Sequence, residues 1–390
     1  MNILTALTYY RPHYSGLTIY AERLARALAQ RGHHVTVLTS RYNNSLPSHE
    51  VQDGVEIYRS RVFMRISKGV LMPSMPWLAW KLIRTADVVQ LHLPQLDAAP
   101  IALMARMLGR PVILTHHCDL ILPHGAIHWL ANQVSHLANT LSASAAHRIV
   151  QNSRDYAEKS TFLQRYLAKL YPIYPPIQIE DTSPDEVAAF KQKAGIHPGQ
   201  KIIGMVARLA TEKGVEYLAE ALPLVLQRHP QARVLFVGPH QNIVGEEAYA
   251  RRLEPLLSSL GQHWTFLGIL PEREKTSFFK SCDLVVNSSI NSTESYGLVQ
   301  VESMMCGTPV VVTDLPGIRV PVQQTRMGLL VPPGDAQALA QAINQLLEFP
   351  EAYRGNPAEL LEASHPEKVA EEYEIVFRLV MKGSTQGKGK

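Results

Sequence analysis

Hydrophobic residues along this chain follow two alternating patterns: short β-branched runs, and longer stretches in which apolar residues recur every three or four positions. The first pattern is typical of buried strands and the second of amphipathic helices. In the first half, a strand is predicted at residues 3–8 and a helix at residues 19–30, with Gly32 after its end. Further strands of this half are predicted at residues 34–39, 88–92, 112–116 and 148–152.

The second half repeats this alternation of strands and helices. Strands are predicted at residues 201–206, 233–238, 264–267, 283–288, 309–313 and 328–331. Helices are predicted at residues 214–228, 247–260, 272–281, 298–306 and 336–348. Strands that alternate with helices in this way are typical of a parallel sheet with helices packed on it. The fold class predicted for each half is therefore α/β.

A proline-rich segment at residues 171–179 separates the two halves, since prolines cannot continue a helix and stiffen a crossing segment. The domains expected are an N-terminal one at residues 1–180 and a C-terminal one at residues 181–365. A last helix is predicted within residues 366–382. A disordered tail is expected at residues 383–390, which are rich in Gly, Ser and Lys.

The composition is that of a soluble globular protein: 46% of its 390 residues are hydrophobic and 18% are charged. A net charge of +4 fits an anionic ligand, a nucleic acid or an anionic membrane surface, and does not choose between them. The three cysteines are widely spaced and form no CxxC pair, so a reducing, cytoplasmic location is expected. A signal peptide and a membrane span of ~18–20 apolar residues are not predicted.

The strongest local signal is the segment 291–312, where a polar loop follows a strand and a glycine precedes a helix. The backbone N–H groups around Gly297, Leu298 and Val299 are first-turn donors, which together with the helix dipole form an anion site. Glu302 stands about one turn into the helix and offers an acceptor to a ribose diol, and Glu294 offers one to a sugar. Taken singly, Glu302 is also consistent with a solvated first-turn glutamate, and Glu294 with an ordinary loop acid.

A second signal is the segment 206–214, which contains a strand end, a loop and a helix start. Arg208 follows the carboxyl end of the strand, where open α/β sheets bind ligands, and Lys213 lies at the mouth of the helix. Two cations there would neutralise a departing diphosphate. An isolated arginine and lysine are also consistent with ordinary surface cations.

These segments together resemble glycosyltransferase family 4, the large retaining family on the GT-B fold, and the resemblance extends over nearly the whole chain. It rests on Glu294-x7-Glu302 with the intervening Tyr-Gly-Leu, on Arg208 with Glu212-Lys213-Gly214, and on Cys306-Gly-Thr-Pro309. The turn at residues 12–17 also matches the family's opening, except that family members commonly show Gly-Gly where this chain has Ser15-Gly16.

The resemblance implies two Rossmann-like domains facing across a cleft, with the last helix returning to the N-terminal domain. It implies that Arg208 and Lys213 hold the donor diphosphate, that Glu302 binds the ribose and that Glu294 binds the transferred sugar. Gly16 would bring N-terminal backbone to the phosphate, and residues 268–270 would lie along the base. The donor-binding set expected from the resemblance is Gly16, Arg208, Lys213, Leu270, Glu294, Ser295, Tyr296, Gly297, Leu298, Val299 and Glu302.

A histidine after the strand at residues 112–116 faces the transferred sugar in similar enzymes, and His117 matches that position better than His116. The expected catalytic residues are therefore His117 and Glu294. Several histidines are close in sequence here, namely His116, His117, His124, His128 and His136. Their spacing lacks the acid of a zinc helix, and enzymes of this fold generally work without a metal, so neither a metal nor a cofactor is expected.

The segment 59–68, with the nearby Trp77, Trp80 and Lys81, interleaves cations with apolar residues. It fits a surface that faces a lipid-linked acceptor, and it also fits a loop and buried helix with snorkelling cations. A cytoplasmic protein that is peripheral on the inner face of the membrane is consistent with the first interpretation.

The function expected is retaining transfer of a hexosyl unit from a UDP- or GDP-sugar to a saccharide, a lipid-linked acceptor or a small metabolite, in glycan or glycolipid synthesis. No nucleic-acid partner is expected. A sugar-nucleotide epimerase on the same fold is the alternative. A Rossmann-type NAD enzyme lacks support because no G-x-G-x-x-G follows the first strand. The intact Glu294, Arg208 and Lys213 argue against a non-catalytic interaction protein.

Overall fold

The computed structural model describes residues 1–66, 69–119, 126–241, 243 and 245–386. The chain divides into two compact units. Unit 1 comprises Met1–Pro176 and Ala363–Lys390, and unit 2 comprises Ile177–Glu362. Each unit has its own sheet and its own buried core, as the alternation of strands and helices predicts.

Unit 1 contains an eight-stranded sheet in the order β10-β9-β8-β7-β1-β2-β4-β3. Its described pairs are parallel except β3 with β4. The strands are β1 (Asn2–Ala6), β2 (His34–Arg41), β3 (His49–Gln52), β4 (Val55–Arg61), β7 (Val88–Leu93), β8 (Val112–His116), β9 (Arg148–Gln151) and β10 (Leu170–Pro172). A separate hairpin is formed by β5 (Met64–Ile66) and β6 (Gly69–Leu71). None of the strands β3 to β6 was predicted from the sequence.

Helices cover both faces of this sheet because successive residues of a strand point to opposite sides. Ile3, Val35 and Ile113 pack with α1 (Gly16–Gln30) and α14 (Pro366–Gln386). Leu4, Leu91 and their equivalents pack on the other face, mainly with α2 and α3. The helices that contribute to this second face are α2 (Met75–Thr85), α3 (Ala98–Met107), α4 (Ala126–Ala145) and α5 (Arg154–Lys159).

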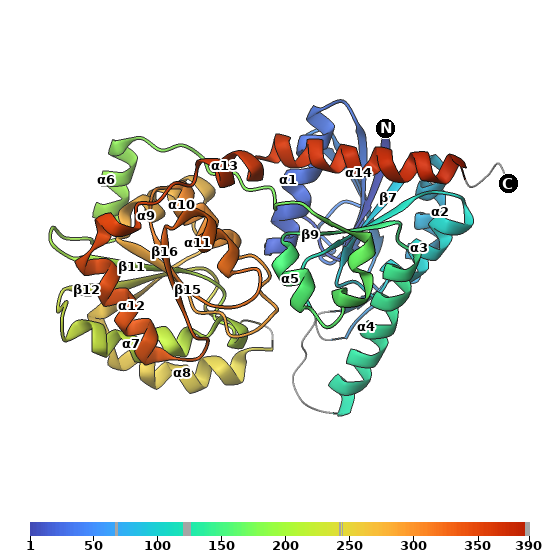
Figure 1. The fold of residues 1–390 in the computed structure, drawn as a ribbon. Helices are drawn as coiled ribbons and strands as arrows, with labels where there is room; N and C mark the ends of the chain where they lie inside the picture. Colours follow the sequence, from blue (N-terminus) through green and yellow to red (C-terminus); the bar gives the residue numbers. More distant parts are fainter. Residues whose placement is uncertain (67–68, 120–125, 242, 244, 387–390) are drawn as a thin grey trace. The chain divides into compact units, whose positions relative to one another are not determined.

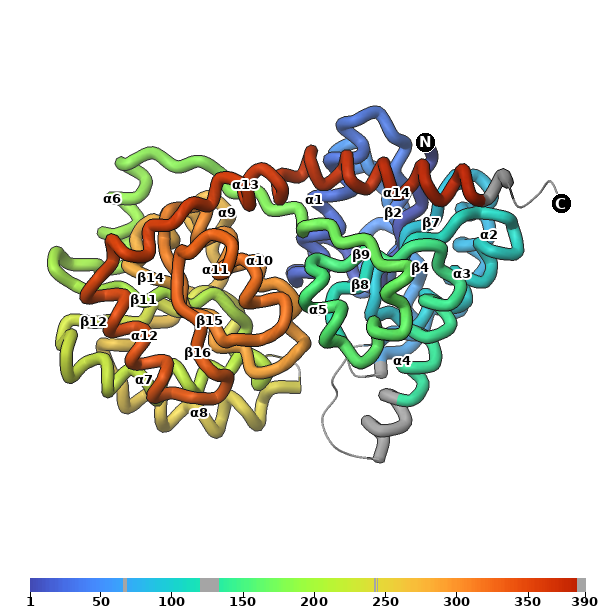
Figure 2. The backbone as a smooth tube through the Cα atoms, in the orientation of Figure 1, coloured from blue at the N-terminus to red at the C-terminus, as the bar shows by residue number. Residues whose placement is uncertain are grey.

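The last helix returns to unit 1, where it lies beside α1 (Figure 2). Tyr373 and Phe377 of α14 are buried in the core, and Glu374 accepts a hydrogen bond from Arg31 Nε at 2.6 Å. The helix continues to Gln386, so residues 383–386 are helical where the sequence predicted a disordered tail. Residues 387–390 of that tail lie outside the described part of the chain.

Unit 2 contains a six-stranded parallel sheet in the order β13-β12-β11-β14-β15-β16. The strands are β11 (Lys201–Val206), β12 (Ala232–Val237), β13 (Trp264–Gly268), β14 (Leu284–Asn287), β15 (Val310–Thr313) and β16 (Gly328–Val331). The helices are α6 (Pro184–Lys193), α7 (Val215–Leu226), α8 (Glu247–Ser259), α9 (Glu272–Ser281), α10 (Leu298–Met305), α11 (Arg319–Thr325), α12 (Ala336–Glu348) and α13 (Ala358–Ser364). Five of them agree with the predicted ranges within two residues, but α6, α11 and α13 were not predicted.

In both sheets the first strands of the unit are added on one side of its first strand, and the later strands are added on the other side. This change of side falls between β1 and β7 in unit 1 and between β11 and β14 in unit 2. In open α/β sheets, ligands bind beyond the carboxyl ends of the strands at this topological switch point. A ligand site is therefore expected at the loops after β1, β7 and β8 in unit 1 and after β11 and β14 in unit 2.

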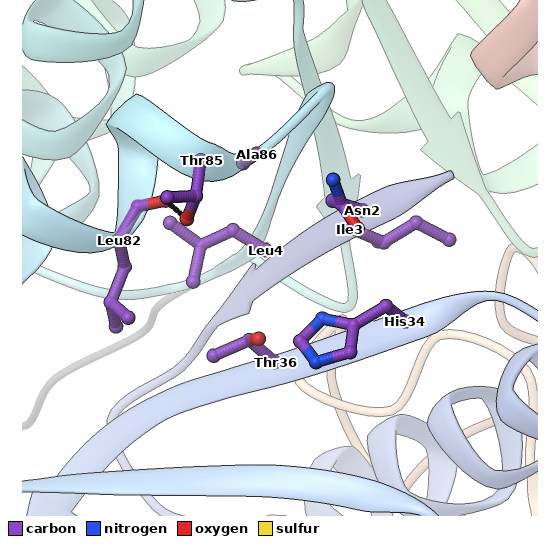
Figure 3. Close-up of a pocket in the computed structure, with 8 residues that line it drawn as sticks. All are labelled: Asn2, Ile3, Leu4, His34, Thr36, Leu82, Thr85 and Ala86. Carbon is purple, nitrogen blue, oxygen red and sulfur yellow. Dashed lines mark hydrogen bonds between the residues drawn. The ribbon is translucent and has the colours of Figure 1, made fainter.

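A hollow of about 150 Å³ lies at the opposite edge of the unit 1 sheet (Figure 3). Asn2 and His34, the first residues of β1 and β2, line it together with Thr85 at the end of α2. The hydroxyl of Thr85 donates to the carbonyl of Leu82 at 3.0 Å. Because this hollow is at the amino ends of the strands, it is remote from the switch point and does not belong to the candidate site.

Candidate functional site

The loops after β11 and β14 of unit 2 are held together by hydrogen bonds. The hydroxyl of Ser288 donates to the carbonyls of Lys213 and Gly214, at 3.1 and 2.9 Å. Gly214 has φ +56°, and a Cβ on it would lie 2.3 Å from the carbonyl oxygen of Ser288, so only glycine fits this close approach. Gly214 and the hydrogen bonds of Ser288 therefore hold Lys213 close to the loop after β14.

An ion pair lies at the switch point between these two loops. Lys213 Nζ is 2.5 Å from Glu294 Oε2, and both side chains are about one-fifth exposed. The other carboxylate oxygen of Glu294 accepts from the backbone N–H of Gly297 at 3.1 Å. An ammonium group has three donors, so Lys213 can hold Glu294 and still donate to a ligand.

The environment keeps Glu294 ionised. Burial by itself raises the pKa of this carboxyl, but the charge of Lys213 and the hydrogen bonds from Lys213 and Gly297 lower it more. The net result is a pKa below the ordinary value. Glu294 is therefore a carboxylate at neutral pH, able to accept hydrogen bonds from the hydroxyls of a sugar.

Gly297 immediately precedes α10 and has φ +76°, a conformation that favours glycine. The first-turn amides of Leu298 and Val299 have no partner within the helix itself, and such amides are suited to an anion. The side chains of Ser295 and Tyr296 are buried beneath the loop, at 7% and 1% exposure. These two residues therefore offer a ligand mainly their backbone.

Glu302 is 3% exposed, and its Oε2 lies 3.1 Å from Lys275 Nζ of α9. Glu302 was predicted from the sequence but Lys275 was not, because the two are far apart in the chain. The contact with Lys275 holds the Glu302 carboxylate in one orientation. A carboxylate held in this way suits the acceptor role that the resemblance implies.

Arg208 follows β11 and is 40% exposed, and its Nη2 donates to Glu212 at 2.7 Å. Leu270 is half-buried and follows β13, at the same edge of the sheet. The ring of His240, after β12, stacks on Phe266 of β13 with centroids 4.4 Å apart. Sequence reasoning missed this aromatic pair, because nothing in the spacing of two residues so far apart along the chain indicates that they meet.

In unit 1, Gly16 is the first residue of α1, which follows β1 and its loop. The helix begins three residues earlier than predicted. Ser15 is its N-cap, since the Ser15 hydroxyl accepts from the N–H of Thr18 at 3.2 Å. Ser15 therefore stabilises the start of the helix, and Gly16 is exposed.

His117 directly follows β8, and its N–H donates to the carbonyl of Leu93 at the end of β7. Its ring stacks on His92, and Nε2 is 2.8 Å from His92 Nδ1. Burial lowers the pKa of His92 to about 3 and that of His117 well below its ordinary value, so both rings are neutral. His92 was not predicted, although it ends a predicted strand in the same pattern.

The hydrogen bonds around His92 favour one tautomer of this pair. Among the described residues, His92 Nε2 is buried without a hydrogen-bond partner. A buried N–H without a partner is less well tolerated than a bare acceptor, so the proton of His92 belongs on Nδ1. His92 then donates to His117 Nε2, and the proton of His117 lies on Nδ1. His117 is left with an N–H donor.

His117 also contacts a buried polar network that reaches α14. Its ring meets that of Tyr20 edge to face, with centroids 4.9 Å apart. The hydroxyls of Tyr20 and Tyr373 are 2.8 Å apart, and that of Tyr373 is 2.9 Å from Thr115 Oγ1. The C-terminal helix therefore helps to fix the surroundings of His117.

His116 points away from this network. Its ring stacks on Phe162 and its Nε2 lies 3.5 Å from Asp119 Oδ1. Among the side chains that the structure describes, no group of three His, Cys, Asp or Glu is arranged to hold a metal. His124 and the side chain of His128 lie outside the described residues.

The segment that suggested a lipid-facing surface divides into two parts. Arg59 is buried on β4 and pairs with Glu50 at 2.5 Å, so it does not face a lipid. Trp77 and Trp80 of α2 are 70% and 40% exposed, whereas the other face of this helix is buried in the core. Lys68 lies outside the described residues. Within the part of the chain described, no helix combines the length and the apolar character of a membrane span.

Two Rossmann-type units, a cationic and glycine-rich ligand edge in the second and a C-terminal helix that returns to the first define a GT-B glycosyltransferase. Residues 15–170 match the family model "Glycosyl transferase 4-like domain", and residues 186–356 match "Glycosyl transferases group 1". The chain belongs to this family of glycosyltransferases.

Individual relatives agree with this assignment. The chain is 27% identical to an uncharacterized glycosyltransferase of Methanocaldococcus jannaschii, over 85% of each chain. It is 26% identical to the 2-deoxystreptamine N-acetyl-D-glucosaminyltransferase of Streptomyces fradiae, over 87% of this chain and 84% of that one. Among solved structures, Anabaena HepE in complex with UDP-glucose superposes with a TM-score of 0.73 at 22% identity, over 99% of this chain and 100% of the other.

Proposed function

We propose that this glycosyltransferase moves a hexosyl unit, with retention of configuration, from a UDP- or GDP-sugar to an acceptor hydroxyl. The observation that carries the proposal is the Lys213–Glu294 pair at the switch point of unit 2. It combines a cation for the diphosphate with an ionised acceptor for sugar hydroxyls. The UDP-glucose in the Anabaena relative and the amino-sugar transfer of the Streptomyces relative support a donor of this class.

Different residues bind the diphosphate, the ribose and the base of the donor. Lys213 and Arg208 neutralise the diphosphate, and the first-turn amides of Leu298 and Val299 donate to its oxygens. Glu302 accepts from the ribose hydroxyls while Lys275 holds its carboxylate in place, and the backbone near Leu270 lies along the base. Gly16 adds an N–H from the start of α1.

The acceptor reaction needs no protein nucleophile in this proposal. Stabilising the departing diphosphate and positioning the acceptor supply the rate enhancement. His117 donates Nδ1–H to an oxygen of the transferred sugar, and Glu294 accepts from the hydroxyls of that sugar. The amide atoms of Gln95, which follows β7 and is 5% exposed, have no partner among the described residues, so Gln95 is a candidate for contact with the acceptor.

The acceptor itself is a saccharide, a lipid-linked saccharide or a small metabolite. For the lipid-linked case, the enzyme works in the cytoplasm as a peripheral protein on the inner face of the membrane. Neither a metal nor an organic cofactor takes part in this scheme, and nucleic acid is not a partner.

The test is a thermal-shift screen of the purified protein against a panel of nucleotide diphospho-sugars. One or a few donors should raise the melting temperature, and Glu302→Ala should remove most of that rise. Glu274→Ala is the matched control, since Glu274 is an exposed carboxylate on α9 that pairs with Lys193. If no sugar nucleotide stabilises the wild-type protein, the proposal is wrong.

A donor-only incubation separates the transferase from the alternative, a sugar-nucleotide epimerase. An epimerase converts the donor without an acceptor and releases a modified sugar nucleotide. The transferase instead leaves the sugar nucleotide unchanged, apart from slow hydrolysis, until an acceptor is added. Proton NMR of the product then reads the anomeric configuration, and an inverted product would contradict retention.

A further inference from the structure

Three helices of unit 1 lie side by side on one face of its sheet. The helix α3 packs against both α2 and α4, and Figure 1 shows the three in cyan to teal together. All three contribute to the same core, which is separate from the core formed with α1 and α14. Their outward-facing sides form one surface, which we call the α2–α4 face.

The α2–α4 face exposes large apolar side chains on each helix. Trp77 and Trp80 of α2 are 70% and 40% exposed, and Met107 of α3 is 78% exposed. The others, all at least two-fifths exposed, are Leu103 of α3 and Val134, Leu137 and Leu141 of α4. Single exposed apolar residues are normal on a soluble protein, but seven on three adjacent helices mark an interaction surface.

The charges on this face have one sign. None of the residues of α2, α3 and α4 is Asp or Glu in the sequence. Lys81 and Arg84 lie one turn beyond the exposed tryptophans of α2, and Arg106 lies beside Met107 on α3; all three are exposed. Helices on the opposite face of the sheet are different, since α14 alone carries Glu367, Glu371, Glu372 and Glu374. The absence of acids is thus a property of this face and not of the unit.

We propose that the α2–α4 face docks on a bilayer that contains anionic phospholipid. Tryptophan side chains combine an apolar ring with an N–H donor and are enriched where a protein meets the interface of a membrane. Neighbouring lysines and arginines are attracted to anionic headgroups, and a carboxylate would be repelled there. This proposal rests on the peripheral membrane location given in the proposed function, and it names the surface and the lipid involved. None of the donor-binding residues takes part in the docking.

Co-sedimentation with vesicles tests the docking. The wild-type protein should bind vesicles of equal parts phosphatidylcholine and phosphatidylglycerol at least about tenfold more tightly than vesicles of phosphatidylcholine alone. Raising NaCl from about 0.05 to about 0.5 M should weaken the binding, because salt screens the attraction. Equal binding to both vesicles, or binding to neither, overturns the proposal.

Two pairs of substitutions assign the binding to this face. Trp77→Ser with Trp80→Ser should reduce binding at least about tenfold, and Lys81→Glu with Arg84→Glu should abolish the preference for anionic vesicles. The matched controls are Ile375→Ser with Leu379→Ser, two exposed apolar residues of α14, and Lys193→Glu with Arg251→Glu on unit 2. Binding that the controls reduce as much as the test pairs contradicts the assignment.

The same samples separate this proposal from the proposed function. Stabilisation by a sugar nucleotide should be unchanged in all the variants, which shows that they are folded and that the donor site is intact. If a donor stabilises the protein but vesicles do not bind, the docking alone is wrong. Light scattering adds a last outcome: a wild-type dimer that Trp77→Ser with Trp80→Ser dissociates, without vesicle binding, would show that a second copy of the chain covers the face.

Discussion

The ligand edges of the two units use opposite electrostatics. The edge of unit 2 is built from ion pairs: Lys213 with Glu294, Arg208 with Glu212, and Lys275 with Glu302. The part of the unit 1 edge around His117 is built from neutral groups, with His92 and His117 stacked beside a network of tyrosine, threonine and glutamine side chains. A diphosphate needs charge to be neutralised, and a sugar hydroxyl needs only a well-placed donor or acceptor. The two edges are thus suited to the two halves of a glycosyl transfer.

The difference also affects what each unit tolerates. Removing one partner of a buried ion pair leaves an uncompensated charge, which costs several kcal/mol of folding free energy. Removing one partner of a neutral hydrogen bond costs less. Substitutions in the edge of unit 2 are therefore expected to lower kcat/KM more. Substitutions in the edge of unit 1 are expected also to change the folding stability and its pH dependence.

The largest effect is expected for Lys213→Met, which should lower kcat/KM about 1000-fold, because the departing diphosphate loses its main cation. Steady-state kinetics with the donor found in the thermal-shift screen measures this. Lys193→Met is the control, since Lys193 pairs with Glu274 on the surface of the same unit and should change kcat/KM little. A variant within threefold of the wild type, about 0.6 kcal/mol in transition-state energy, would remove Lys213 from the mechanism.

The same substitution should change the pH profile. Lys213 lowers the pKa of Glu294, so in the wild type the activity that depends on ionised Glu294 is lost only when the pH falls below the ordinary range of a glutamate. In Lys213→Met burial acts without that opposing charge, and the acid limb of kcat/KM should move to higher pH. An acid limb that stays in place would show that another group controls it.

His117→Asn should lower kcat/KM about 100-fold while the donor still stabilises the protein, because in the proposed function His117 contacts the transferred sugar and not the nucleotide. His116→Asn is the matched comparison. His116 stacks on Phe162 and points away from the network, so its replacement should cost stability and affect kcat/KM less. The reverse order of the two effects would exchange the roles of the adjacent histidines.

Unit 1 should lose stability in mild acid while the ion pairs of unit 2 still hold. The folded-state pKa of His92 is about 3, far below its ordinary value, so the unfolded chain binds the proton first as the pH falls through about 6.5. At pH 5 this one group should cost unit 1 about 2 kcal/mol relative to pH 7.5. Glu294 has a lowered pKa, so its contribution to unit 2 is present above the unfolded pKa of about 4.5 and persists at pH 5.

Urea unfolding at pH 7.5 and pH 5, with proteolysis to assign cleavage to each unit, measures this difference. Burial raises the pKa of Asp97 in unit 1 to about 6, which favours the folded state in acid and offsets part of the loss. His92→Asn isolates the histidine, since it should lower stability at pH 7.5 but reduce the further loss at pH 5. An unchanged pH dependence in this variant would exclude His92 as its cause.

The sequence predicted the two units and the edge of unit 2 better than the edge of unit 1. Gly214, Gly297 and the Glu294-x7-Glu302 spacing are local, because each consists of a strand end, a loop and a helix start. Lys275, which pairs with Glu302, comes from another helix, and His240 meets Phe266 only because β12 and β13 are neighbours. Tertiary contacts of this kind leave no periodic signal in one sequence.

The edge of unit 1 depends on contacts between residues that are even farther apart in the sequence. Tyr373 of the last helix reaches Tyr20 of the first and Thr115 of β8, so the surroundings of His117 are complete only when both ends of the chain are packed. The hairpin of β5 and β6 was also missed, because its three-residue strands are too short for an alternating pattern. The acid-free α2–α4 face needed the structure, since only packing shows that three separate helices lie together.

The smallest effects are expected at two helix starts, one in each unit. Ser15 caps α1, and Ser183 caps α6 with a reciprocal contact from Glu186. Replacing either with alanine should cost about 1 kcal/mol, a fall in melting temperature of roughly 2–4 °C for units of this size. Differential scanning calorimetry is the measurement.

The two caps should differ in their effect on the donor. If the exposed start of α1 donates to the diphosphate through Gly16, then fraying this helix in Ser15→Ala should raise the KM for the donor a few-fold. Ser183→Ala should leave that KM unchanged, because α6 does not begin at either switch point. Equal KM values in the two variants would mean that the ligand edge of unit 2 holds the diphosphate without help from unit 1, and that the electrostatic division between the two edges is complete.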